Sequence, residues 1–165
     1  MSGAHRVRGV HVLCDDDPRW KWDLRVQARA ACEGGAAVVQ LRCKHTTDRE
    51  ALVVARDLRA LTRAAGCAFV VNDRFDLALL AEADGVHLGQ GDLPPGRLPE
   101  AAHARLFVGR STHTREQARA VCEEPVDYLA FGPVFGTASK ASEWSARGTD
   151  RLRDIAALAL SLIHI

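Results

Sequence analysis

Polar residues that could do chemistry recur along this chain in five clusters, each at or shortly after the end of a short apolar run. The clusters are Gln40, Arg42 and Lys44; Asn72, Asp73 and Arg74; Gln90 and Asp92; Ser111, Thr112 and His113; and Thr137 with Lys140. Aspartate carboxylates are the hard oxygen ligands that Mg²⁺ takes together with phosphate oxygens. Arginine offers phosphate a bidentate fork, and lysine offers it a mobile point charge. Together these residue types predict a Mg²⁺–polyphosphate site.

Each cluster taken singly also has an ordinary structural interpretation. Asp73 follows an apolar run and is typical of a residue that begins a helix. Asp92 precedes a Leu-Pro pair and is typical of a turn, and Ser111 could cap the helix that comes next. The histidines near these runs are expected as core, rim or helix-cap residues: His11, His87 and His113. The prediction of a site therefore depends on whether the clusters meet in space.

Six short apolar runs predict the strands of a buried parallel sheet. They span residues 9–13, 37–41, 68–71, 85–88, 106–109 and 128–131. Helical patterns separate them, with capping boxes at Thr47–Glu50 and Thr114–Gln117 and a glycine stop at Gly66. This alternation predicts an α/β fold, either a doubly wound sheet or part of a barrel. Because the carboxyl ends of parallel strands share one rim, the five clusters are expected to converge there.

The composition describes one ordinary soluble domain of 165 residues, with 47% hydrophobic and 26% charged residues and a net charge of +1. This charge balance argues against a nucleic-acid binder. No apolar stretch approaches the roughly 18 residues of a membrane span. The N-terminus lacks the apolar core of a secretory signal, which predicts a cytoplasmic protein. The five cysteines are scattered without a Cys-x-x-Cys motif, so we expect reduced thiols rather than a disulfide framework or a zinc site.

Five segments contain the residues of the polar clusters. They are Val39-Gln40-Leu41-Arg42-x-Lys44, Val71-Asn72-Asp73-Arg74, Gly85-Val86-His87-Leu88-Gly89-Gln90-x-Asp92-Leu93-Pro94, Gly109-x-Ser111-x-His113, and Asp127-Tyr128-x-x-Phe131-Gly132-Pro133-Val134-Phe135-x-Thr137-x-x-Lys140. In this order and at this spacing, the segments resemble the thiamine-phosphate synthase family. The resemblance implies a (β/α)₈ TIM barrel. It also implies a Mg²⁺-dependent transferase that joins an aminopyrimidine-methyl diphosphate to a hydroxyethyl-thiazole phosphate. The products would be thiamine phosphate and diphosphate.

The resemblance implies roles for individual residues as well. Asp73 and Asp92 match aspartates that hold Mg²⁺ on the leaving diphosphate. Residues matching those that neutralise or hold the diphosphate are Arg42, Lys44, Asn72 and Lys140. Gln40 matches a pyrimidine contact, Ser111 a hydrogen-bonding partner of the reacting diphosphate, and Thr137 lies in a segment toward the thiazole phosphate. Ser111 and Lys140 are thus the expected catalytic residues.

The implied chemistry needs no nucleophilic side chain. An electron-rich aminopyrimidine can stabilise a benzylic-type cation, so catalysis amounts to stabilising charge on the departing diphosphate and presenting the thiazole nitrogen in line. The sequence departs from the family pattern at Cys43, where an acidic residue is usual, at Gly136, and over residues 141–147, where the usual loop is Pro-rich.

Two other functions stay open at this point. A related class, thiazole tautomerase, shares the fold, and His113 could shuttle protons in it. That class typically lacks the paired aspartates and the Gly-Gln-x-Asp motif, both of which are present here, so the synthase is favoured. The third hypothesis is an inactive fragment or a phosphate-binding regulatory relative.

The length of the chain is short for the implied barrel, which needs about 200 residues or more. We therefore expect about six β/α units over residues 1–159, without the C-terminal loops for the thiazole phosphate. Residues 160–165 read like a translated sequencing-library adapter and are expected to be a non-native tail. The alternative is a genuine seventh strand, since Leu and Ile are good strand formers. A shortened barrel predicts unpaired edges at the first and sixth strands, which favour aggregation or partner pairing.

Overall fold

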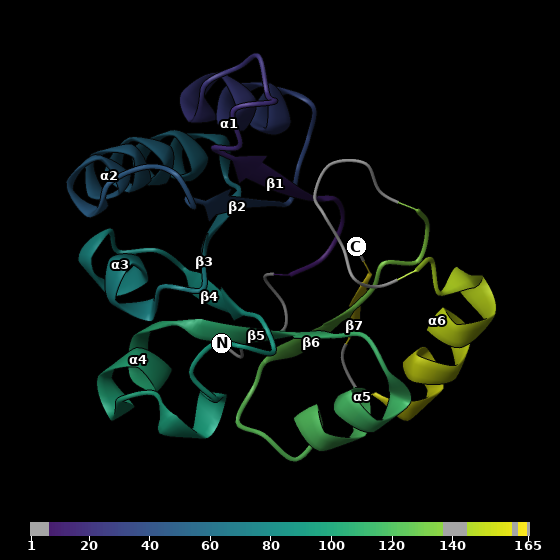
Figure 1. Cartoon of the computed structure of the whole chain (residues 1–165). Coiled ribbons are helices and arrows are strands. Elements are labelled where there is room, and N and C mark those ends of the chain that lie inside the picture. Colours follow the sequence, from purple (N-terminus) through teal and green to yellow (C-terminus); the bar gives the residue numbers. More distant parts are fainter. Residues whose placement is uncertain (1–6, 137–144, 160–161, 165) are drawn as a thin grey trace.

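The computed structural model describes residues 7–136, 145–159 and 162–164, and its strands form one parallel sheet. The strands, in chain order, are β1 His11–Asp15, β2 Val38–Arg42, β3 Ala68–Asn72, β4 Gly85–Leu88, β5 Phe107–Thr112, β6 Tyr128–Phe131 and β7 Leu162–His164. Each strand pairs in parallel with the next one along the chain. The sheet curls around a centre and the helices cover its outside (Figure 1), so the predicted α/β class, an incomplete TIM barrel, is confirmed.

The helices follow the strands in the expected alternation. They are α1 Leu24–Glu33, α2 Asp48–Ala65, α3 Phe75–Leu80, the 3₁₀ turn η2 Pro95–Arg97, α4 Glu100–Arg105, α5 Arg115–Val121 and α6 Gly148–Leu158. Both predicted capping boxes are confirmed, at Thr47–Glu50 and Thr114–Gln117. Gly66 ends α2 in the left-handed conformation, with φ 72°. None of the described helices is long and apolar enough to cross a membrane.

One predicted helix start is wrong. Asp73 does not begin α3, because the residue before that helix is Arg74 and no side chain caps its first turn. Asp73 instead adopts a left-handed backbone with φ 64°, and its N–H donates to the carbonyl of His87 at 2.8 Å. Aspartate tolerates this conformation better than most residues. The turn therefore points the carboxylate away from the helix end and leaves it for the rim.

The two faces of the strands pack differently because successive side chains alternate. Outward residues such as Val39, Phe69 and Val86 pack with helix residues in the main core. The inward residues near the amino ends of the strands are apolar and buried together: Val38, Val70, Phe107 and Tyr128, with Val7 beside them. Inward positions nearer the carboxyl ends of β1 to β5 carry mainly polar side chains instead, whereas β6 places Ala130 there, opposite Ser111. The inner face of the curled sheet is thus apolar at the amino ends of the strands and largely polar at their carboxyl ends. We call the polar end the rim.

The edges of the sheet differ from the expectation. The structure places β7 beside β6, with Leu129 opposite Leu162 and Phe131 opposite His164. In the part of the chain that the structure describes, the edge strands are therefore β1 and β7, and the predicted edge at the sixth strand is wrong. Residues 162–164 follow the alternative of a seventh strand. The non-native origin of residues 160–165 stays a prediction.

Two aspartates at the amino ends of strands make the same pair of hydrogen bonds to the backbone of a neighbouring strand, which we call a clamp. Asp84, before β4, donates its N–H to the carbonyl of Phe69 at 2.9 Å and accepts the N–H of Phe69 on its carboxylate at 2.8 Å. Asp127, before β6, does the same to Val108, at 2.8 Å and 2.7 Å. Each clamp joins a strand to its neighbour one residue beyond the ladder. The clamps therefore help to set the register in which rim residues meet.

We expect Asp127→Ala to lower the free energy of unfolding by about 2 kcal/mol, because the N–H of Val108 loses a charged acceptor. Urea denaturation followed by fluorescence measures the loss. Asp127→Asn is the matched control, because its amide oxygen can still accept the hydrogen bond and its loss should be smaller. Equal losses in both variants would show that the hydrogen bond contributes nothing.

Candidate active site

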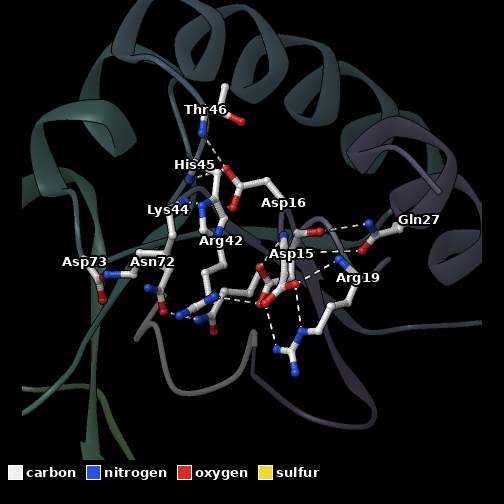
Figure 2. Close-up of polar contacts among 12 residues, drawn as sticks. Asp15, Asp16, Arg19, Gln27, Arg42, Lys44, His45, Thr46, Asn72 and Asp73 are labelled. Carbon is white, nitrogen blue, oxygen red and sulfur yellow. Dashed lines mark hydrogen bonds and ion pairs between the residues drawn. The ribbon is translucent and has the colours of Figure 1, made fainter. Parts of the chain in front are cut away.

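The polar rim gathers side chains from the carboxyl ends of several strands, as the sequence predicted. Figure 2 shows side chains of β1 and β2 and of the loops after them beside those of β3, with Asp15 and Arg42 pointing toward one another. Of the predicted site residues, the structure describes Gln40, Arg42, Lys44, Asn72, Asp73, Asp92 and Ser111. Thr137 and Lys140 lie outside the described residues. Six of these residues make three groups, each with its own contacts, and Ser111 belongs to a fourth set.

The first group is an ion pair that sequence reasoning missed. Arg42 Nη1 lies 2.8 Å from Asp15 Oδ2, and the Asp15 side chain is only 8% exposed. Asp15 and Arg42 are opposite one another in the β1–β2 ladder, which places both side chains on the inner face. Gln27 of α1 holds the backbone of Asp15 from both sides, at 3.0 Å and 2.9 Å. The guanidinium is thereby aimed at the rim by a fixed carboxylate.

Asp16 was also missed, and it shapes the loop that carries Lys44. Its carboxylate accepts the backbone N–H groups of Lys44, His45 and Thr46 at 2.8, 2.8 and 2.7 Å (Figure 2). Burial raises the pKa of Asp16, but these hydrogen bonds outweigh it and hold the pKa below its ordinary value. The loop after β2 is therefore ordered by a charged residue from the loop after β1. No local pattern in the sequence signals this contact.

The second group is the amide pair Gln40 and Asn72. Gln40 Nε2 donates to Asn72 Oδ1 at 2.7 Å, and Gln40 is 3% exposed. This hydrogen bond fixes which way the Gln40 amide faces. Gln40 Oε1 is then left buried beside the His11 ring, and it accepts no hydrogen bond of normal geometry from the described residues. A buried acceptor of this kind costs free energy until a donor reaches it, so it is suited to a ligand N–H group.

His11 lies on the inner face of β1, close to this pair. Burial lowers its pKa to about 4, although the neighbouring Gln40 side chain raises it in part. A histidine whose folded pKa lies below the unfolded value gives stability that is present above the unfolded pKa and is lost as the pH falls toward the folded pKa.

We therefore expect the free energy of unfolding to fall by about 2 kcal/mol more in the parent than in His11→Gln between pH 6.5 and pH 4. Denaturation at a series of pH values measures the difference. His103→Gln changes an exposed histidine of α4 and should keep the parent profile. If His11→Gln kept the parent's dependence of unfolding free energy on pH, the low pKa would not belong to His11.

The third group joins two carboxylates and a lysine at the ends of β3 and β4. Lys44 Nζ lies 2.5 Å from Asp73 Oδ2, and Asp92 Oδ2 accepts the N–H of Gly89 at 2.6 Å. Burial raises the pKa of Asp92, and the adjacent Asp73 raises it further, while Gly89 and Lys44 oppose the shift. The two aspartates are thus close enough to repel one another. A Cβ at Gly89 would lie 3.1 Å from Asp92 Oδ2, so the glycine leaves room for that carboxylate.

This donor set fits Mg²⁺. Two hard carboxylates that repel one another gain from a shared divalent cation, and Mg²⁺ commonly takes one or two carboxylates with phosphate and water oxygens. The described residues contain no group of three or more His, Cys, Asp or Glu arranged for a metal. The remaining ligands would therefore come from substrate and water, as expected for a Mg²⁺–diphosphate site.

Ser111 lies inside β5, within a buried hydrogen-bonded set that the sequence did not predict. Its Oγ is 2.8 Å from His87 Nε2, and His87 Nδ1 is 2.9 Å from the hydroxyl of Tyr128. The backbone carbonyl of Ser111 accepts a hydrogen bond from Gln90 Nε2 at 2.5 Å. His113 is placed elsewhere: its Nδ1 lies 2.6 Å from the carbonyl of Gly132, and its N–H donates to Gln117. Ser111 therefore faces the rim from β5, while His113 joins the loops after β5 and β6.

Comparison with known proteins decides which family has this arrangement. The family model described as "Thiamine monophosphate synthase" matches residues 10–163. The chain belongs to the thiamine monophosphate synthase family. It is 47% identical to the thiamine-phosphate synthase of Anaeromyxobacter dehalogenans over 94% of this chain, and 45% identical to that of Synechococcus sp. over 72% of it.

A solved structure of the family supports the fold independently. The thiamine phosphate pyrophosphorylase from Pyrococcus furiosus is similar to this chain with a TM-score of 0.81 and 34% identity, covering 94% of this chain and 73% of that one. The chain spans only part of its relatives' length: 34% of the Synechococcus protein and 68% of the Anaeromyxobacter protein. Membership of the thiamine monophosphate synthase family is thus shown for the β/α units that carry the rim.

Proposed function

We propose that this chain carries the pyrimidine-diphosphate side of a thiamine-phosphate synthase site. The reaction would join an aminopyrimidine-methyl diphosphate to a hydroxyethyl-thiazole phosphate, giving thiamine phosphate and diphosphate. The observation that carries the proposal is the pair Asp73 and Asp92 beside Lys44, at one rim of a family member. These small molecules are the proposed partners, and a cytoplasmic location belongs to the same proposal.

The residues of the rim divide the work by charge. Arg42, aimed by Asp15, and Lys44, on the loop ordered by Asp16, would neutralise the diphosphate as its bond to the pyrimidine methylene breaks. Lys44 contacts Asp73 at present, so substrate would share or take over this contact. A bound Mg²⁺, held by Asp73 and Asp92, would supply further charge neutralisation on the leaving group.

The uncharged side chains would orient the pyrimidine. Gln40 Oε1, a buried oxygen that accepts no hydrogen bond of normal geometry from the described residues, is suited to the exocyclic amine of the ring. Asn72 fixes that orientation through its hydrogen bond to Gln40 Nε2. Ser111 would donate to the reacting diphosphate. Holding the pyrimidine in one orientation raises the rate of the reaction, because the thiazole nitrogen must approach the methylene carbon in line. Thr137 and Lys140 keep their implied roles as predictions.

The test measures diphosphate release from the two substrates as a function of Mg²⁺. Two proteins are compared: this chain, and this chain extended by the part of the Anaeromyxobacter relative that follows the match. We expect release from the extended protein only when both substrates and Mg²⁺ are present. Substrate binding by this chain alone should appear as a Mg²⁺-dependent rise in Tm with the pyrimidine diphosphate. Thiazole isomerisation without diphosphate release would favour the tautomerase instead.

A further inference from the structure

A buried hydrogen-bonded chain crosses the inner face of the sheet from β6 through β4 to β5. It consists of Tyr128, His87 and Ser111, joined at 2.9 Å and 2.8 Å. Tyr128 is 1% exposed and His87 is 4% exposed, whereas Ser111 is partly exposed at the rim. The hydrogen-bonded series of Tyr128, His87 and Ser111 therefore runs from the buried interior of the barrel to the face where substrate is proposed to bind.

The backbone is shaped to admit the Tyr128 ring. A Cβ at Gly109 would lie 2.0 Å from Cζ of Tyr128 and 2.4 Å from its hydroxyl oxygen, so only glycine leaves the space. The ring is stacked on His87, with centroids 5.5 Å apart, and packs against Phe107 at 6.0 Å. Three neighbouring strands thus hold the hydroxyl at one place, against His87 Nδ1.

The hydrogen bonds between Tyr128, His87 and Ser111 can run in either of two directions, set by the His87 tautomer. Burial raises the pKa of Tyr128, so the phenol keeps its proton. Within the described residues, the hydrogen-bond partner of that hydroxyl is His87 Nδ1. If Tyr128 donates there, neutral His87 carries its own proton on Nε2 and donates it to Ser111 Oγ. The proton of Ser111 is then left to point at the rim. In the reverse direction, Ser111 would use its proton on His87 and turn its lone pairs toward an anion.

We propose that Tyr128 and His87 are positioning residues that make Ser111 a hydrogen-bond donor toward the departing diphosphate. The proposal rests on the function proposed above for what Ser111 meets, but the direction of the chain can be tested without it. No proton leaves the chain in this role: Tyr128 donates to His87, His87 donates to Ser111, and Ser111 donates to a phosphate oxygen. Such preorganised donors act where charge develops during bond cleavage.

The first experiment reads the His87 tautomer in the protein without substrate. ¹⁵N-histidine labelling and long-range ¹H–¹⁵N spectra distinguish the tautomers, and His87→Gln assigns the signal. We expect His87 to be neutral and protonated on Nε2, and Tyr128→Phe to remove this preference while the ring packing stays. A proton on Nδ1, a charged imidazole, or a tautomer unchanged in Tyr128→Phe would overturn the proposal. Phe107→Leu is the control, because it changes the packing beside Tyr128 but removes no hydroxyl group. His87 should keep the Nε2 tautomer in this variant.

The second experiment is a double-mutant cycle on diphosphate release by the extended protein. We expect Tyr128→Phe to lower kcat roughly tenfold with little change in KM, because one oriented hydrogen bond is weakened. In the Ser111→Ala background, Tyr128→Phe should lower kcat no further. Losses that multiply would mean that Tyr128 does not act through Ser111. If the proposed function fails, the parent releases no diphosphate, while the tautomer measurement still decides the direction of the chain.

Discussion

We expect Asp92→Ala to lower the proposed Mg²⁺-dependent diphosphate release by the extended protein by about two to three orders of magnitude. This expected loss is the size seen when one preorganised group that stabilises developing charge is removed. The loss is expected at Asp92 because the N–H of Gly89 holds its carboxylate beside Asp73, where both carboxylates could bind the cation. The measurement is kcat at saturating substrates over a Mg²⁺ titration. Release that survives Asp92→Ala undiminished would refute the metal assignment.

A matched control and a second readout separate the metal site from general damage. Asp48→Ala removes a carboxylate that is 80% exposed and paired with Arg74, and it should keep the parent activity. The Tm of the chain should rise with Mg²⁺ in the parent and in Asp48→Ala but not in Asp92→Ala.

Asp73 and Asp92 also predict a pH-dependent change in the stability of the metal-free chain. Burial and then Asp73 raise the pKa of Asp92, so the carboxylate form costs stability once the pH exceeds that pKa. Asp92→Asn should therefore raise the Tm of the metal-free chain at neutral pH, and the gain should disappear in acid, where Asp92 is protonated. The gain is small, at most about 0.5 kcal/mol, because solvent screens charges at this exposure. A Tm lowered at neutral pH would contradict the repulsion.

Gly109→Ala should destabilise the fold by about 3 kcal/mol, the upper part of the range for overpacked cores. The added methyl group would occupy the place of the Tyr128 ring, whose Cζ lies 2.0 Å from the new atom. For a chain of this length, the Tm should fall by roughly 6–12 °C. Gly96→Ala is the control, because nothing lies within 4 Å of its added Cβ.

A second substitution tests the cause of that loss. Tyr128→Leu removes the atoms that the methyl group would meet, so Gly109→Ala should cost less in the Tyr128→Leu background than in the parent. A Gly109→Ala protein that melts within a degree or two of the parent would contradict the packing argument. Equal losses in both backgrounds would place the strain somewhere other than at Tyr128.

Much of the fold follows from local patterns in the sequence. The run Gly85–Leu88 is a strand with the predicted bounds, and Tyr128–Phe131 is another. The capping box at Thr47 and the stop at Gly66 bound α2 as predicted, because capping involves residues only a few positions apart. The polar residues of the four clusters that the structure describes also lie at the carboxyl ends of neighbouring parallel strands, as expected, whereas the cluster of Thr137 and Lys140 stays a prediction.

The failures are contacts that no local pattern contains. Asp73 was predicted to begin a helix, but a left-handed turn and a hydrogen bond to the neighbouring strand direct it to Lys44 instead. Asp15 and Asp16 carry no motif of their own. They became part of the site because the register of β1 against β2 places one beside Arg42 and the other under the Lys44 loop.

By itself, then, the sequence indicated six of the strands that the structure describes, the family and the polar residues that follow those strands, but not Asp15 or Asp16. Periodicity, capping and motif spacing are short-range properties, and they survive without knowledge of the rest of the chain. Only the tertiary structure decided that Ser111 meets His87, 24 positions away, and that His87 meets Tyr128, 41 positions away. The physical reason is that these partners are selected by strand register, sheet curvature and the space left at Gly109, which depend on all the strands at once.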